Sequence, residues 1–205
     1  MPGLPVYSTK QAKLEQEIRN GANQILKALS LVETWQVGDL NTALLCEFQQ
    51  VAITQIYTCA GTLRDGPVSI QGVKHQPPPH TEVPALVQEM CDYINNNWGR
   101  TAIHLSAYLM WRVNWIHPFY GGNGRTAHVI AYLILSAKLG FKIPGTVTIP
   151  DLIDSERGPY YDALRKADTA FESGKLDISS MEELMSSMLA KQLVGVHKQA
   201  AGTQV

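Results

Sequence analysis

The sequence predicts a single all-α domain with one short β-hairpin. Apolar residues recur at helical spacing through most of the chain, and alternation typical of a strand occurs only in the glycine-rich stretch 64–79. Of the 205 residues, 45% are hydrophobic and 17% are charged, which is typical of a globular chain and not of a disordered one. A chain of this length can bury one core, so we expect one domain over residues 1–205.

The expected helices begin after a loose lead-in over residues 1–8. The first two, within residues 1–60, are expected to pack against the rest of the domain, and Gly21 is a candidate break in the first. The apolar face of the first helix consists of Leu14, Ile18, Ala22, Ile25, Leu26 and Leu29. Helices are expected at about 9–32, 40–61, 81–97, 101–116, 125–140, 151–156, 159–168 and 179–193.

Polar residues at the starts of these helices are the expected caps, because their side chains can accept hydrogen bonds from the first backbone N–H groups. Ser179 and Glu182 have the spacing of a capping box. The other expected N-caps are Asp39, Thr81, Thr101 and Asp151.

Residues 64–79 interrupt the helical pattern. They contain G-P-V-S-I-Q-G-V-K, in which polar and apolar residues alternate between glycines, and the tract Pro77–Pro79, which cannot be helical. The alternation predicts a strand or short hairpin, with a connecting loop as the alternative.

Charge and cysteine content argue against several classes of function. The net charge of -1 offers no basic field, so we expect neither nucleic acid nor a membrane as a partner. The cysteines Cys46, Cys59 and Cys91 are odd in number and widely spaced, which indicates neither a disulfide framework nor a thiolate metal site. The sequence has no basic start followed by an apolar run, and no run of about 18 apolar residues, so we expect a cytoplasmic protein.

The stretch from His117 to His128 carries the chemistry. It reads H-P-F-Y-G-G-N-G-R-T-A-H and places an imidazole ahead of three glycines and an arginine at the start of an apolar helix. Glycines allow successive backbone N–H groups to converge on one anion at a helix N-terminus. Arg125 can add a bidentate charged donor, and His117 is close enough to deprotonate a hydroxyl that attacks the bound phosphate. The alternative is an ordinary turn beside a structural histidine.

The same stretch resembles the signature of the Fic (Fido) family, H-x-F-x-(D/E)-G-N-G-R-x-x-R. His117, Phe119 and the run from Gly122 to Arg125 agree with it, as does the position between a loop and a helix. The resemblance extends over about residues 60–195. It implies a Fic-type helical bundle with a hairpin flap near 64–79 that lines up the target by strand-like pairing.

The resemblance further implies protein adenylyltransferase activity (AMPylation), in which AMP moves from ATP to a Ser, Thr or Tyr hydroxyl of a target protein. His117 would be the general base. Phosphate would be bound by backbone N–H groups, by the Asn123 side chain and by charged side chains, at Gly122, Asn123, Gly124, Arg125 and His128. Tyr161 and Asp168 would approach the nucleoside. The flap residues that would position the target are Val68, Ser69, Ile70 and Gln71.

Two residues depart from the signature. Gly121 stands where an acidic residue usually holds Mg²⁺, and His128 stands where a second arginine is usual. We therefore expect the nucleotide to carry Mg²⁺ without a protein ligand, and a reduced activity. The alternatives are a catalytically weakened nucleotide-binding module, a Fic enzyme that uses another phosphate-containing donor, and a structural helical adaptor.

Fic proteins often carry, or receive from a partner, an inhibitory helix that reads (S/T)-x-x-x-E-(G/N). No such match occurs in this chain. A separate inhibitory protein is therefore a partner to consider.

Overall fold

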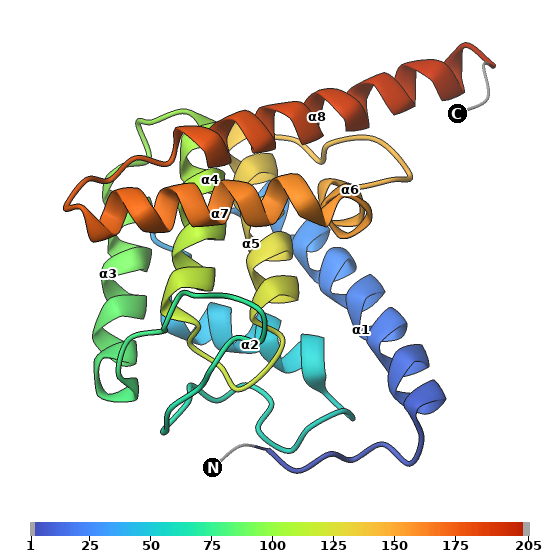
Figure 1. Ribbon diagram of the computed structural model, residues 1–205. Coiled ribbons are helices and arrows are strands. Elements are labelled where there is room, and N and C mark those ends of the chain that lie inside the picture. Colours follow the sequence, from blue (N-terminus) through green and yellow to red (C-terminus); the bar gives the residue numbers. More distant parts are fainter. Residues whose placement is uncertain (1–2, 203–205) are drawn as a thin grey trace.

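The computed structural model describes residues 3–202, and the part of the chain that it describes is built from α-helices without a β-sheet (Figure 1). This confirms the all-α prediction. The helices are α1 Lys10–Leu31, α2 Thr42–Ile53, α3 Val83–Asn96, α4 Ala102–Ile116, α5 Asn123–Leu139, α6 Ile149–Ser155, α7 Arg157–Glu172 and α8 Ser179–Ala200, with short 3-10 helices at Val32–Thr34 and His80–Glu82.

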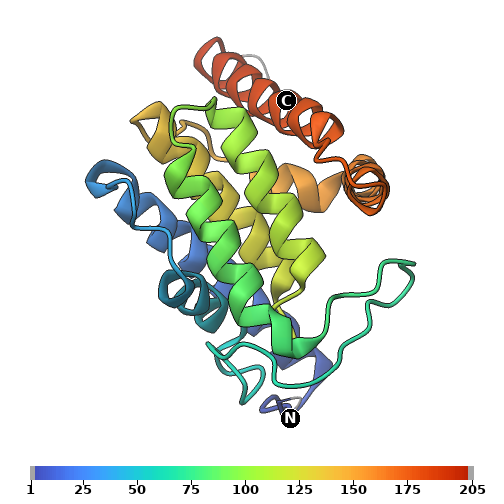
Figure 2. The ribbon, with the colours of Figure 1, turned by 90° about the vertical axis from the view of Figure 1, so that its left-hand side faces the viewer.

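The centre of the fold is the pair α4 and α5, which lie side by side in both ribbon views (Figures 1 and 2). Every residue from Leu105 to Val113 and from Thr126 to Ser136 is buried. A helix that is enclosed on all sides belongs in the core of a bundle. The short loop 117–122 joins these two helices, so the motif is attached at both ends to the best-packed part of the protein.

The other helices enclose this pair. α1 and α2 pack against α5, α3 packs against α4, and α7 and α8 run together across the bundle. The last turns of α8 extend beyond the rest of the bundle (Figure 1). None of the helices in residues 3–202 is long and apolar enough to cross a membrane.

α1 buries a different face from the one expected, and it is unbroken at Gly21. The Asn20 amide donates to the carbonyls of Ala52 and Thr54 at 3.2 and 2.9 Å, and the Gln24 amide donates to the Phe48 carbonyl at 2.9 Å. The carbonyls of Ala52 and Thr54 lie in the last turn of α2 and just after it, where carbonyls have no partner inside the helix. The Gln24 amide adds a bond to a carbonyl farther inside α2. Because these polar contacts turn another face of α1 towards α2, four members of the expected apolar face are exposed, namely Leu14, Ile18, Ala22 and Leu26.

The second helix starts later and ends earlier than expected. Its N-cap is Asn41, whose Oδ1 accepts from the N–H of Leu44 at 2.9 Å, and not Asp39. The helix stops at Ile53 instead of near Gly61. Gln55 has a left-handed φ of 60°, which a continuing helix does not allow.

The remaining expected caps are partly correct. Thr101 caps α4 through a 3.1 Å bond from the N–H of His104, as expected. Thr148 and not Asp151 is the N-cap of α6, and Asp151 completes a capping box by accepting from the N–H of Thr148 at 2.8 Å. Two expected caps are wrong: a 3-10 turn precedes α3 without a side-chain cap from Thr81, and the expected box at Ser179 is replaced by other contacts.

The lead-in is not loose over its described part. The N–H of Val6 donates to the carbonyl of Ile56 at 2.9 Å, and the N–H of Thr58 donates to the carbonyl of Leu4 at 3.1 Å. The chain start therefore pairs with the segment that follows α2, while residues 1–2 lie outside the described residues.

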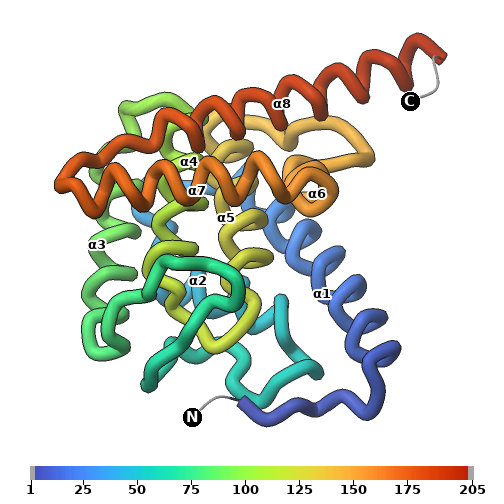
Figure 3. The backbone as a smooth tube through the Cα atoms, viewed as in Figure 1, coloured from blue at the N-terminus to red at the C-terminus, as the bar shows by residue number. Residues whose placement is uncertain are grey.

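Residues 64–79 form a loop with one turn, so the predicted hairpin is wrong (Figure 3). The N–H of Val73 reaches the carbonyl of Ile70 at 3.4 Å, but no strand flanks this turn. The Arg64 side chain, and not a facing strand, satisfies the carbonyls of Gly66 and Pro78 near the two ends of the loop.

Candidate active site

His117 ends α4 and begins the motif loop. Its N–H donates to the Val113 carbonyl at 2.9 Å, and its backbone is left-handed, with a φ of 50°. A non-glycine residue pays about 1–2 kcal/mol for this conformation. The surrounding structure must therefore hold His117 in place, and this is typical of functional residues.

Burial sets the protonation state of His117. Removal from water lowers the pKa of its imidazole to about 4, and the nearby charge of Arg64 acts in the same direction. Its Nδ1 atom is buried without a hydrogen-bond partner. At neutral pH the ring is therefore uncharged and able to accept a proton.

The loop turns into α5 at Gly122, which has a left-handed φ of 77° and is the N-cap of the helix. A Cβ atom at this position would lie 2.8 Å from Cγ2 of Ile53, so both the backbone and the packing require glycine here. The first N–H groups of α5 have no acceptor inside the helix. Together with the positive end of the helix dipole they form a site for an anion.

The Asn123 side chain braces this turn. Its Oδ1 accepts from the N–H of Phe119 at 3.0 Å, and its Nδ2 donates to the carbonyl of Phe119 at 2.8 Å. The Phe119 side chain is fully buried and anchors the loop in the core. Both the oxygen and the nitrogen of the Asn123 amide thus form hydrogen bonds within the loop, and phosphate binding by this amide stays a prediction.

Arg125 lies in the first turn of α5 and contacts α1. One of its terminal nitrogens, Nη2, is 3.3 Å from Oε1 of Glu17, while Nη1 is buried without a partner. An arginine remains charged even where burial lowers its pKa, as it does here. Arg125 therefore supplies a fixed positive charge in the first turn of α5, and its Nη1 donor is unused among the described residues.

A cleft of about 690 Å³ opens beside His117. It is lined by residues from α4, from α7 and from the loop 64–79, and it contains Tyr161 and Asp168. Asp168 accepts a hydrogen bond from Nε1 of Trp111 at 2.9 Å. Of the four expected flap residues, the structure brings Ile70 and Gln71 to the cleft lining, but not Val68 and Ser69.

The Fic/DOC family model matches residues 39–135, which include α2, α3, α4, the motif loop and most of α5. This stretch of the chain is therefore similar to a Fic/DOC family domain. Fic domains in general transfer a nucleoside monophosphate to proteins. No curated protein matches the sequence.

Solved Fic structures share the fold at 20% sequence identity. A Fic family protein from Desulfovibrio desulfuricans matches with a TM-score of 0.68, over 97% of this chain and 57% of its own. A Fic domain containing signaling protein from Bacteroides thetaiotaomicron matches with a TM-score of 0.76, over 97% and 78%. A fragment of Fic-1 from C. elegans matches with a TM-score of 0.72, over 98% and 55%. The chain thus spans little more than half the length of two of these relatives.

At the two positions that depart from the Fic signature, the site lacks charged groups. Gly121 has no side chain, and His128 is 6% exposed, with its pKa lowered to about 4 by burial and by the charge of Arg157. The Nε2 atom of His128 is buried without a partner, and its ring packs edge-on against Tyr160 at 4.9 Å. At neutral pH His128 supplies no positive charge.

The residues around Gly121 do not supply a metal site. In residues 3–202 no group of three or more His, Cys, Asp or Glu side chains is placed to hold a metal ion.

Sequence reasoning missed two residues whose side chains bind backbone carbonyls of the loop 117–122. The Gln49 amide donates to the carbonyl of Gly121 at 3.0 Å and accepts from the N–H of Gly61 at 2.6 Å. Arg64 donates to the carbonyl of His117 at 2.8 Å. Both side chains lie far in sequence from residues 117–128 and belong to no motif or periodic pattern. Their contacts with this stretch therefore become visible only in the folded structure.

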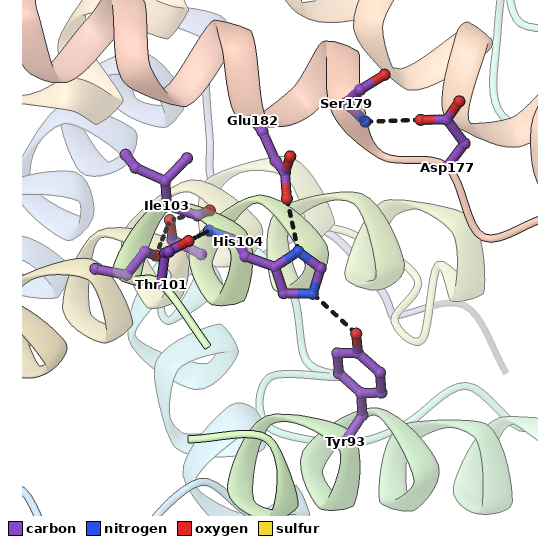
Figure 4. Close-up of polar contacts among 9 residues, drawn as sticks. Tyr93, Thr101, Ile103, His104, Asp177, Ser179 and Glu182 are labelled. Carbon is purple, nitrogen blue, oxygen red and sulfur yellow. Dashed lines mark hydrogen bonds and ion pairs between the residues drawn. The ribbon is translucent and has the colours of Figure 1, made fainter. Parts of the chain in front are cut away.

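The other histidine of α4, His104, contacts two neighbouring helices through its two ring nitrogens. Its Nε2 lies 2.8 Å from the Tyr93 hydroxyl and its Nδ1 lies 2.6 Å from Oε1 of Glu182 (Figure 4). These contacts join α3, α4 and α8. They also explain why Glu182 does not take part in a capping box with Ser179, whose N–H binds Asp177 instead (Figure 4).

Proposed function

We propose that the domain is a protein adenylyltransferase, which moves AMP from ATP to a Ser, Thr or Tyr hydroxyl of a target protein. The observation that carries this proposal is the placement of a neutral His117 and the anion site at the start of α5 on one braced loop. A base and a phosphate site this close together suit attack by a hydroxyl on a phosphorus atom.

In the proposed reaction, the α-phosphate of ATP lies at the N-terminus of α5. The target hydroxyl attacks its phosphorus while His117 takes the hydroxyl proton, so that a new O–P bond forms as the proton leaves. The bond to the β-phosphate breaks, and pyrophosphate departs with the bonding electron pair. The N–H groups from Gly122 to Gly124 stabilise the charge that develops on the phosphoryl oxygens, and Arg125 stabilises the departing pyrophosphate.

Gly124 supports the approach of a phosphate to the backbone. A Cβ atom at this position would meet no heavy atom within 4 Å, so the packing of the protein does not require glycine here. Glycine in a helix costs about 1 kcal/mol relative to alanine. A residue with that cost and no packing role fits a site where a ligand must come close to the main chain.

The cleft would hold the nucleoside and the target segment. Tyr161 is 46% exposed and Asp168 retains carboxylate oxygens for hydrogen bonding, so both are available to a nucleoside. Ile70 and Gln71 also line the cleft, and we assign the whole stretch from Val68 to Gln71 to target positioning. An irregular loop can still pair its free backbone groups with an extended target.

Mg²⁺ would enter this site with the nucleotide. No carboxylate stands at Gly121 to hold it, and the roles given to His117, Arg125 and the helix N-terminus do not depend on it.

A second candidate function is nucleotide binding with weak or no transfer, or transfer from another phosphate-containing donor. The neutral, buried His128 favours this candidate, because a triphosphate gains no charge compensation from it. A donor with fewer negative charges than ATP would lose less binding free energy from the missing positive charge.

The test is incubation of cell lysate with ATP labelled in the α-phosphate, using the wild type, His117→Ala and His197→Ala. His197 is exposed on α8 and serves as the matched histidine control. We expect labelled proteins with the wild type and with His197→Ala, and none with His117→Ala. Equal labelling with His117→Ala would show that this residue is not the base.

A further inference from the structure

We propose that Arg64 is the positioning residue of this site, which fixes the backbone of His117 and both ends of the loop 65–79 through one buried guanidinium. The expected change in the transfer rate rests on the proposed function. The expected changes in the backbone of His117 and in the loop 65–79 rest on the hydrogen bonds of Arg64 alone.

The Arg64 side chain is 3% exposed and donates to four carbonyl groups from three segments. Nε donates to His117 at 2.8 Å, Nη2 donates to Ile116 at 3.3 Å and to Pro78 at 2.5 Å, and Nη1 donates to Gly66 at 3.2 Å. The planar fork of an arginine can serve several acceptors at fixed angles, which the single ammonium of a lysine cannot do.

Two of these carbonyls belong to the end of α4. The last carbonyls of a helix accept no hydrogen bond from within the helix. A cation near them is favourable because they form the negative end of the helix dipole. The backbone N–H of Arg64 adds a bond to the carbonyl of Pro118 at 2.8 Å. Arg64 therefore binds the three consecutive carbonyls of Ile116, His117 and Pro118, around the left-handed residue of the loop.

The other two carbonyls, those of Gly66 and Pro78, lie near the ends of the loop whose middle lines the cleft. A single side chain thus sets the base on one side of the cleft and the loop on the other. A displacement of about 1 Å in such a site can lower a rate by about 100-fold.

The charge of Arg64 has a second effect. All of its described hydrogen-bond acceptors are backbone carbonyls, and none is a carboxylate. Its positive charge lowers the pKa of His117, in addition to the larger effect of burial. Loss of the guanidinium should therefore alter the imidazole as well as the backbone.

The experiment compares Arg64→Lys and Arg64→Met with Arg112→Lys. Arg112 is the matched control: it is also 3% exposed and packs at 4.4 Å over the ring of Trp115, but no described hydrogen bond joins it to the motif loop. Three quantities are measured in the folded proteins: the NMR titration of His117, hydrogen exchange of residues 65–79, and transfer from ATP.

We expect Arg64→Met to raise the pKa of His117 towards the ordinary value for histidine, because a positive charge beside the imidazole is removed. We expect both Arg64 variants to exchange faster in residues 65–79 and to lower kcat by about 10- to 100-fold, with the Kd for ATP within about threefold of the wild type. Arg112→Lys should lower stability without changing any of these. Arg64→Lys keeps the charge and provides a folded sample if Arg64→Met does not fold.

An unchanged His117 titration and unchanged loop exchange in folded Arg64 variants would overturn the inference, as would the same changes in Arg112→Lys. If the wild type transfers nothing from ATP while the Arg64 variants still shift the titration and loosen the loop, the proposed function fails and the positioning role stands.

Discussion

Replacing Gly122 by alanine should destabilise the protein strongly. An alanine at a φ of 77° loses about 1–2 kcal/mol relative to its preferred conformations. Its methyl group would also lie 2.8 Å from Cγ2 of Ile53, and such overpacking in a core typically costs about 1–3 kcal/mol. The sum, about 2–5 kcal/mol, is a large part of the stability of an ordinary domain. Urea denaturation measures it as a change in the free energy of unfolding.

The two neighbouring motif glycines provide the controls for Gly122→Ala. Neither Gly121 nor Gly124 has a heavy atom within 4 Å of an added Cβ, and neither has a left-handed φ. Gly121→Ala and Gly124→Ala should therefore leave the free energy of unfolding unchanged within about 0.5 kcal/mol or raise it by up to about 1 kcal/mol. Gly124→Ala should nevertheless weaken ATP binding about tenfold or more, because its methyl group occupies the space assigned to phosphate.

A loss below about 0.5 kcal/mol for Gly122→Ala would refute this account of the turn, because a backbone able to relax that cheaply would not be a preformed anion site. Unchanged ATP affinity of Gly124→Ala would refute the placement of phosphate at the helix start.

Three further predictions follow from the charges and contacts of the site. Gly121→Asp should raise the rate of Mg²⁺-dependent transfer by about 10- to 1000-fold, which corresponds to about 1.4–4 kcal/mol of transition-state stabilisation. Initial rates with and without Mg²⁺ measure this change, and unchanged rates would argue for a donor that is bound without metal. The pKa values of His117 and His128 are lowered to about 4, so the unfolded chain binds more protons than the folded chain between about pH 4 and 6.5. The free energy of unfolding should therefore be highest above this pH range and fall by roughly 3 kcal/mol per histidine as the pH drops through it. Urea titrations of the wild type and His128→Gln at pH 7 and pH 4.5 check this, and an equal loss in both proteins would contradict the burial of a neutral His128. His104→Ala, which removes the contacts to Tyr93 and Glu182, should lower the free energy of unfolding by about 1–3 kcal/mol and leave the transfer rate unchanged at low temperature, whereas a loss of transfer in the folded variant would give His104 a role in the site.

The helical class and the order of the helices could be predicted from the sequence, because apolar periodicity and glycine or proline boundaries are local signals. The central helices α4 and α5 were clear from their continuous apolar character and from Thr101 and Gly140 at their ends. The orientation of α1 could not be predicted in the same way. It depends on Asn20 and Gln24 reaching carbonyls of α2 and the residue after it, which is a contact between segments distant in sequence.

For the site, the pattern from His117 to His128 indicated the turn between two helices and the proposed roles of its residues, because glycine, proline and histidine each have strong local consequences. The alternation in residues 64–79 was misleading. That loop is shaped by the Arg64 guanidinium, and a buried arginine that binds carbonyls leaves no periodic signal. The two hydrogen bonds between the Asn123 amide and the backbone of Phe119 were not predicted, because neither residue belongs to a pattern that indicates this contact.

The most direct test of the central claim is a comparison of two labelled donors with the purified protein and a protein acceptor. ATP labelled in the α-phosphate and ATP labelled in the γ-phosphate are supplied in parallel, to the wild type and to His117→Ala. We predict that the α-label, and not the γ-label, becomes protein-bound with the wild type, and that neither does with His117→Ala. Incorporation of the γ-label, or equal incorporation of the α-label by His117→Ala, would contradict transfer of AMP by a base at His117.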